Sequence, residues 1–216
     1  MIVSGPSGCG KTTFITNLIN NLDFLIEKKI ENIVWCYAEK NSIMDFNNKG
    51  VQYCMGIPEN LENTANTTKL IILDDMMRDV YNEQISELFT KGSHHRNISV
   101  ILVTQNIFHK GNHSRDISLN AKYLVVFKNP RDQLQFQYLS RQIFPDNSKE
   151  VLRIYKEVTN IPYNYLLLDL TQDIQESLRI RSNIFNRDYC EVYCHINNND
   201  LKPTTFEEKQ AYITCS

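Results

Sequence analysis

The residues best suited to chemistry stand near the start of the chain, where the sequence fits the pattern G-x-x-x-x-G-K-[ST]. The matching stretch is Gly5-Pro6-Ser7-Gly8-Cys9-Gly10-Lys11-Thr12, followed by Thr13. Between a strand and a helix, this pattern wraps backbone N–H groups around phosphates at the helix N-terminus. We expect Lys11 to reach the β- and γ-phosphates and the Thr12 hydroxyl to bind Mg²⁺. A chance glycine-rich turn is the alternative, but all fixed positions and both flanks favour a phosphate loop. The sequence therefore predicts binding of a nucleoside triphosphate with Mg²⁺.

Two carboxylates follow a short apolar run further along the chain. Leu70-Ile71-Ile72-Leu73 is typical of a buried strand, and Asp74 and Asp75 come directly after it. In open α/β folds, ligands bind at the carboxyl ends of such strands. We expect Asp74 to complete the Mg²⁺ site, directly or through water, and Asp75 to be the general base for an attacking water. The alternative is a strand that ends in a solvated Asp-Asp turn.

An amide side chain ends the next apolar run, Ser99-Val100-Ile101-Leu102-Val103. Thr104-Gln105-Asn106 follows this run, and we expect Gln105 to sense the γ-phosphate or to position water. An amide suits this role because it offers both a donor and an acceptor. An ordinary turn at the end of a strand is the alternative.

Phosphoryl transfer also needs positive charge on the γ-phosphate, which an arginine from a neighbouring subunit often supplies. We expect Arg96 in this role, with Arg115 second and Arg131 and Arg141 as further candidates. Arg96 precedes the strand that ends at Val103, so it lies at the opposite end from the chain's own phosphate loop. We therefore expect it to face a neighbouring subunit. The alternative for each of them is an ordinary surface charge.

A basic segment between residues 91 and 115 contains no Asp or Glu and holds four of the five histidines. Because contacts to a nucleic-acid backbone are driven by counterion release, they favour cations without nearby carboxylates. The stretch from Phe108 to Arg115 has the composition of a flexible, basic pore loop. A solvated loop with neutral histidines is the alternative. The predicted DNA contacts are Lys91, His94, His95, Lys110 and Arg115.

Apolar runs alternate with helical patterns along most of the chain. The runs are continuously apolar, as in strands that helices cover on both faces. We therefore expect an α/β domain of three layers with a mostly parallel central sheet. We place this domain at residues 1–185, and a polar, loosely ordered extension at 186–216. The predicted strands are 1–3, 33–37, 51–55, 70–73, 99–103, 123–127, 165–168 and an edge strand within 178–185; the predicted helices are roughly 12–28, 77–91, 131–142 and 147–159.

Composition limits the classes of protein to consider. The 216 residues are 42% hydrophobic and 22% charged with a net charge of −2, which is ordinary for a globular domain. Since no apolar run approaches the roughly 18 residues that span a bilayer, we expect no membrane partner. The start does not read as a signal peptide, and the six scattered cysteines favour a reducing compartment. Because so few residues precede the phosphate loop, we expect either a short first strand or a chain that lacks upstream sequence.

Taken together, the motifs resemble the genome-packaging ATPases of the FtsK–HerA superfamily, especially the poxvirus-type enzymes of adintoviruses and Maverick/Polinton elements. The resemblance covers residues 1 to about 185. It implies a ring-forming, ATP-driven motor on double-stranded DNA, a hexamer or pentamer that fills a capsid and meets capsid or portal proteins. It also implies assembly in the host nucleus or at a cytoplasmic virus-assembly site. The stretches that carry it are residues 5–12, 73–77, 91–96, 104–106, 113–115, 127–132 and 179–185.

Two other classes of protein share the phosphate loop. A nucleotide kinase should carry an arginine-rich lid over the phosphates, and no compact arginine cluster follows a helix in this sequence. A P-loop NTPase switch that acts as a binding module predicts slow hydrolysis that DNA does not change. The Asp74-Asp75 pair fits water activation better than it fits a kinase.

Overall fold

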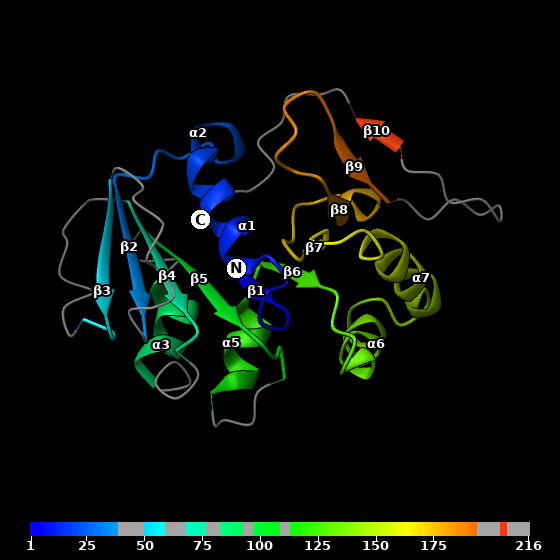
Figure 1. Ribbon diagram of the computed structural model, residues 1–216, viewed down its shortest axis with the longest axis horizontal. Helices are drawn as coiled ribbons and strands as arrows, with labels where there is room; N and C mark the ends of the chain where they lie inside the picture. The colour runs from blue at the N-terminus through cyan, green and yellow to red at the C-terminus, as the bar shows by residue number, and fades with distance from the viewer. Residues whose placement is uncertain are drawn as a thin grey trace. The chain divides into compact units, whose positions relative to one another are not determined.

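The computed structural model describes residues 1–38, 50–58, 68–76, 83–92, 97–108, 113–193 and 204–206. Figure 1 shows its helices and strands with their labels. The chain forms two compact units. Of the described residues, the first unit holds Met1–Val3 and Thr12–Ala121, and the second holds Ser4–Lys11 and the chain from Lys122 onward.

The first unit contains a parallel sheet. Its strands lie in the order β1 (Ile2–Ser4), β5 (Ile98–Thr104), β4 (Lys69–Asp74), β2 (Asn32–Tyr37) and β3 (Val51–Met55). The β5–β4, β4–β2 and β2–β3 pairs are parallel. The Met1 amino group donates to the Val100 carbonyl at 2.8 Å, and the Leu102 N–H donates to the Met1 carbonyl at 2.9 Å. The carboxyl ends of β1, β4 and β5 therefore meet at one edge of this sheet.

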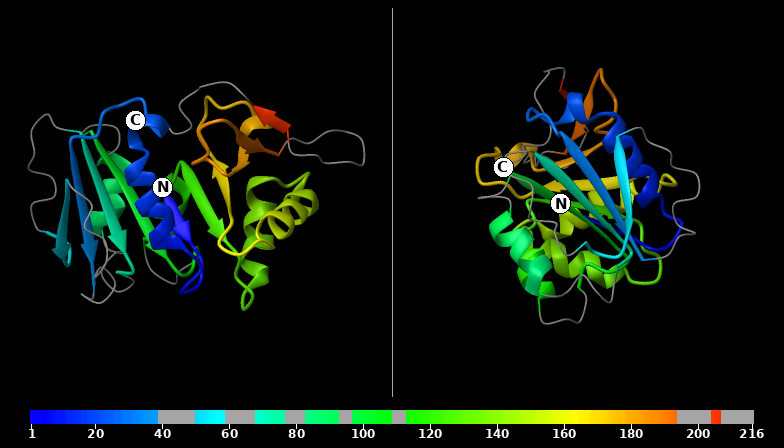
Figure 2. Two further views of the ribbon diagram at one scale, coloured as in Figure 1. Left: turned by 45° about the horizontal axis from the view of Figure 1, so that its top comes forward. Right: turned by 90° about the vertical axis from the view of Figure 1, so that its left-hand side faces the viewer.

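Helices cover both faces of the parallel sheet, which explains the continuously apolar strands. All six residues of β4 are buried. Helices α1 (Lys11–Asn20) and α2 (Leu22–Leu25) lie on one face, and α3 (Glu83–Glu87) and α5 (Ser114–Asn120) lie on the other (Figure 2). A π-helical turn, η2 (Leu88–Gly92), continues α3. These three layers are the arrangement that the sequence predicts.

The second unit is built on antiparallel strands. They lie in the order β6 (Tyr123–Phe127), β7 (Tyr165–Asp169), β8 (Ile180–Ser182), β9 (Cys190–Val192) and β10 (Thr204–Phe206). Two helices, α6 (Gln133–Ile143) and α7 (Ser148–Val158), pack together beside them (Figure 1). The rings of Phe136 and Tyr155 stack with centroids 3.9 Å apart and tie α6 to α7. A short 3₁₀ turn, η3 (Glu176–Leu178), precedes β8.

Most element predictions are confirmed, and four are corrected. The helix expected over 12–28 is interrupted after Asn20, where the Asn21 amide donates to the Asn17 carbonyl at 2.9 Å and competes with the helical pattern. The helix expected from residue 131 begins at Gln133, because the Asp132 side chain caps it by accepting from the Gln135 N–H at 3.1 Å.

The other two corrections concern helix α5 and strand β8. Helix α5 replaces part of the loop expected after β5, because Ile117 supplies a buried anchor for one helical turn. The strand expected at an edge, β8, is an interior strand, since β7 and β9 pair with its two sides. The start of the helix predicted over 77–91 lies outside the described residues, as do parts of the 40–69 segment and all of the 195–202 segment. None of the described helices combines the length and the apolar character needed to cross a membrane.

Candidate active site

The phosphate loop (Gly5–Thr12) is shaped by two kinds of glycine constraint. Gly5 is buried, and a Cβ on it would lie 2.6 Å from the Cys9 Sγ and 2.7 Å from the Phe127 Cβ, so a side chain does not fit. Gly10 has φ of +106°, a conformation that other residues rarely adopt. Phe127, the last residue of β6, also lies 3.5 Å from the Cβ position of Gly10. One aromatic ring thus supports the loop at two points.

The ammonium group of Lys11 binds back to the start of this loop. Its Nζ donates to the carbonyls of Gly5 and Pro6 at 2.7 and 2.9 Å. Helix α1 starts at Lys11 and carries no acidic residue in its first turn, so its positive end is not neutralised by its own side chains. This combination fits an anionic ligand such as a triphosphate.

The Cys9 thiol faces the same loop. Burial raises the pKa of the Cys9 thiol, and the charge of Lys11 offsets part of this effect. The thiol therefore stays neutral near pH 7 and adds no negative charge to the phosphate loop.

Asp74 lies at the carboxyl end of β4 and is buried. Its Oδ2 accepts a hydrogen bond from the Trp35 indole N–H at 3.3 Å. Trp35 comes from the neighbouring strand β2 and is itself fully buried, so it fixes the direction of the carboxylate. A buried carboxylate with an oriented oxygen is suited to a metal shell.

Asp75 and Gln105 are brought together at the ends of neighbouring strands. The Gln105 Nε2 lies 3.3 Å from both carboxylate oxygens of Asp75. The register of β4 and β5 produces this contact, because Asp74 pairs with Val103. Asp75 has φ of +49°, in the left-handed region, and its side chain is exposed. The two residues predicted to handle the attacking water thus form one polar pair.

The donors predicted for Mg²⁺ fit that ion. Thr12 is half-buried in the first turn of α1, with Thr13 exposed beside it, and Asp74 ends β4. Mg²⁺ in nucleotide sites takes one or two protein oxygens and completes its shell with water and phosphate. No cluster of three or more His, Cys, Asp or Glu side chains placed for a metal occurs in the described part of the chain. Thr12 and Asp74 offer one hydroxyl and one carboxylate, which is a donor set that fits Mg²⁺.

The predicted arginine and DNA-contact residues are covered only in part. Arg115, expected in a loop, lies exposed in the first turn of α5, and Arg131 and Arg141 are exposed as well. Lys91 lies in η2. His94, His95, Arg96, His109 and Lys110 lie outside the described residues.

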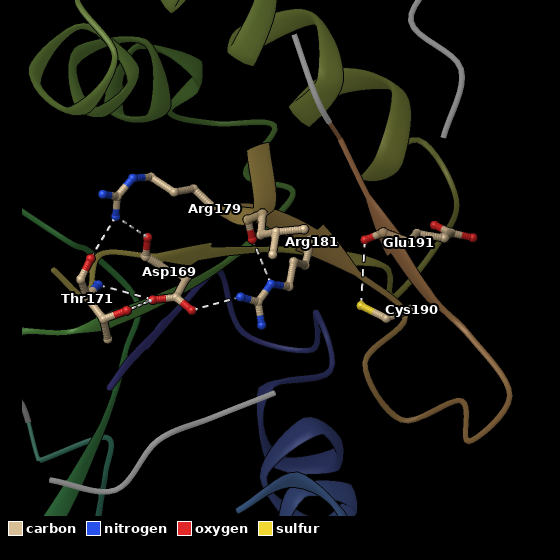
Figure 3. A network of polar contacts seen from close by, with 7 residues as sticks. Asp169, Thr171, Arg179, Arg181, Cys190 and Glu191 are labelled. Atoms are coloured by element: carbon tan, nitrogen blue, oxygen red, sulfur yellow. Dashed lines mark hydrogen bonds and ion pairs between the residues drawn. The ribbon is translucent and has the colours of Figure 1, made fainter. Parts of the chain in front are cut away.

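Two arginines of the second unit, Arg179 and Arg181, bind groups within the same unit (Figure 3). The Nη2 of Arg181 lies 3.0 Å from the Oδ2 of Asp169, and both side chains are buried. The other oxygen of Asp169 accepts from the N–H and hydroxyl of Thr171 at 3.1 and 2.7 Å. Arg179 donates to the carbonyls of Asp169 and Thr171 at 3.0 and 2.9 Å. These guanidinium groups are engaged in holding β7 against β8.

Three residues at the site were missed from the sequence. Trp35 and Phe127 lie in apolar runs that mark them only as strand residues, although Trp35 is the single tryptophan of the chain. Tyr163 follows Pro162 in a turn, and its Cδ1 lies 3.5 Å from the Cβ position of Gly10. The Pro-Tyr-Asn sequence indicates a turn, but it does not indicate that this turn lies beside Gly10.

Comparison with solved structures shows the fold. The genome packaging NTPase B204 from Sulfolobus turreted icosahedral virus 2, solved in complex with ATPγS, superposes with a TM-score of 0.51 at 14% identity over 84% of this chain and 94% of that one. The cytoplasmic domain of the type VII secretion ATPase EccC from Thermomonospora curvata also gives 0.51, at 13% identity over 79% of this chain and 24% of that one. No family model and no curated protein matches the sequence. The chain thus has the α/β fold of P-loop ATPases with a mostly parallel central sheet, as the sequence predicts.

Proposed function

We propose that this chain is an ATPase that translocates double-stranded DNA and packages a viral genome, converting ATP to ADP and phosphate. The observation that carries the ATPase part is the contact between Asp75 and Gln105 at the ends of β4 and β5. A kinase needs to exclude water, whereas a carboxylate next to an amide is suited to orient water. The fold shared with a viral packaging NTPase supports the motor part.

Each residue of the candidate site has a distinct role in this proposal. The phosphate loop and Lys11 bind the β- and γ-phosphates, and Asp75 accepts the proton of the attacking water. Gln105 orients that water through its amide and reports on the γ-phosphate. Thr12 and Asp74 would hold Mg²⁺, which supplies charge neutralisation on the phosphates. Arg96 or Arg115 of a neighbouring subunit supplies further positive charge in a ring of identical chains.

The DNA part of the proposal depends on the segment from Lys91 to Arg115. In a ring, each subunit contributes one such segment to the channel, so a net charge of −2 for the whole chain does not oppose DNA binding. The affinity should fall steeply with salt, because each phosphate contact releases counterions. We also propose that capsid or portal proteins receive the DNA at a virus-assembly site in the host nucleus or cytoplasm.

The test is the rate of ATP hydrolysis with and without linear double-stranded DNA at 50 and 200 mM salt. We expect DNA to stimulate turnover at the lower salt and to lose much of this effect at the higher one. Hydrolysis that DNA does not change at either salt would contradict the motor and leave an NTPase switch. Lys11→Ala is the control, and it should lose nucleotide binding and turnover together. Phosphate transfer to a nucleotide in place of water would identify a kinase.

A further inference from the structure

An exposed tyrosine, Tyr163, lies against the phosphate loop in a strained backbone conformation. Tyr163 has φ of +66°, in the left-handed region that bulky residues rarely adopt. It follows Pro162, and the Asn164 N–H donates to the Ile161 carbonyl at 3.2 Å. Proline at the second position and positive φ at the third are features of a type II turn, where glycine or asparagine is the ordinary choice at that third position. Tyrosine is therefore an unfavourable residue for this turn.

Packing within the second unit offers little compensation for this strain. The side chain of Tyr163 is 72% exposed, and within the described residues it makes no hydrogen bond or ring contact. Its neighbour in the turn, Ile161, is 60% exposed. Residues held in sparsely populated backbone conformations cluster at active sites and ligand-binding positions. The turn thus presents an apolar, aromatic surface to solvent.

The position of that surface specifies its ligand. The Cβ and Cδ1 of Tyr163 lie 3.6 and 3.5 Å from the Cβ position of Gly10, so the ring borders the residue before Lys11. Because the phosphate loop holds the phosphates at the start of α1, the rest of a bound nucleotide has to leave the loop past the residues that border it. A flat apolar ring next to this point fits the face of a purine, because bases and aromatic side chains stack through their π-faces.

We infer that Tyr163 stacks on the base of the bound nucleotide and supplies the base-binding part of the site. This inference rests on the proposed function, since it needs the phosphate loop to bind a nucleotide. Stacking tolerates every base, so Tyr163 adds affinity for a nucleoside triphosphate over a bare polyphosphate without selecting between purines. The ring does not take part in hydrolysis and is not a catalytic residue.

The test compares two ligands, ATPγS and inorganic tripolyphosphate, each with Mg²⁺, by titration calorimetry. We expect Tyr163→Gly to weaken ATPγS binding about 5- to 100-fold and to leave tripolyphosphate binding within about twofold. Tyr163→Phe keeps the ring and should bind ATPγS nearly as well as the wild type. Tyr138→Ala is the control, because Tyr138 is also exposed, at 59%, and this α6 residue has no assigned role in nucleotide binding.

The unfolding temperature distinguishes a Tyr163 side chain that binds ligand from one that supports the fold. Glycine suits the positive φ of this turn, so Tyr163→Gly should unfold at the same temperature as the wild type or a higher one. A clear loss of stability would indicate that the ring supports the fold, and it would overturn the inference.

The two ligands also separate failure of this inference from failure of the proposed function. A wild-type chain that binds neither ligand contradicts the nucleotide site itself. A wild-type chain that binds both, with Tyr163→Gly equal to it for ATPγS, overturns only the stacking role. An equal loss for both ligands would mean that Tyr163 shapes the phosphate loop, and this result too would overturn the inference.

Discussion

Two strands of this molecule end in the same way and serve different purposes. Leu70-Ile71-Ile72-Leu73 leads to Asp74 and Asp75, and Tyr165-Leu166-Leu167-Leu168 leads to Asp169. Asp169 is buried and bonded to Arg181 and Thr171. Asp75 is exposed and contacts the neutral amide of Gln105. A carboxylate that is paired with a buried cation stabilises the fold, whereas one that faces solvent beside an amide is free to take up a proton.

The largest expected effect concerns the exposed member of this comparison. Asp75→Asn should lower turnover of ATP about 10²- to 10⁴-fold, because an amide does not accept the proton of the attacking water. The free energy of unfolding should change by no more than about 0.5 kcal/mol, as at other surface positions. Steady-state hydrolysis and denaturant titration measure the two quantities. Turnover at the wild-type rate would remove Asp75 from the role of base.

The buried member should respond in the opposite way. Asp169→Asn leaves the Arg181 guanidinium buried without its carboxylate, which should lower the free energy of unfolding by about 3–5 kcal/mol. Denaturant unfolding measures this loss. The double variant Asp169→Leu/Arg181→Met removes both charges and should recover much of it. If Asp169→Asn were as stable as the wild type, the distinction between the two aspartates would fail.

A cysteine beside the buried network provides a pH-dependent test. Burial raises the pKa of the Cys190 thiol to about 11, against the smaller opposing effect of Arg181. The folded state therefore favours the neutral thiol, and this contribution is complete below pH 9 and is lost as pH rises through 11. At pH 10 the wild type should be less stable relative to Cys190→Ala than it is at pH 8, by an amount on the order of 1 kcal/mol. Parallel pH profiles for the two proteins would contradict the shift.

The smallest effect concerns Asp74, which is buried like Asp169 but belongs to the candidate site. Trp35→Phe removes the indole N–H that Asp74 accepts at 3.3 Å, at a cost of about 1 kcal/mol in unfolding free energy. The same variant should raise the Mg²⁺ concentration needed for half-maximal hydrolysis, because the carboxylate is less well oriented. Trp35→Phe with an unchanged Mg²⁺ requirement would assign the indole to packing alone.

The sequence predicts the phosphate loop, the strand pattern and the position of Asp75 and Gln105 at strand ends, because each follows from local spacing and from the rule that parallel strands end together. The contact between Asp75 and Gln105 comes from the structure. It does not predict the role of Asp169. The runs before Asp74 and Asp169 are equally apolar, and only the β7–β8 register places Arg181 beside the second. Phe127 and Tyr163 were missed for the same reason, since their contacts with Gly10 join segments more than 100 residues apart.

The division of the chain into units has a practical consequence for building hybrids. Residues Ser4–Lys11, which hold most of the phosphate loop, group with the described residues from Lys122 onward, while Met1–Val3 and Thr12–Ala121 group together. No single cut therefore separates the two units. A chimera that joins the first half of this chain to the second half of a relative would combine this chain's loop with another protein's Phe127 and Tyr163 equivalents. Residues 4–11 should instead be exchanged together with the rest of the second unit. Gly5 and Gly10 then stay with the aromatic side chains that lie against them.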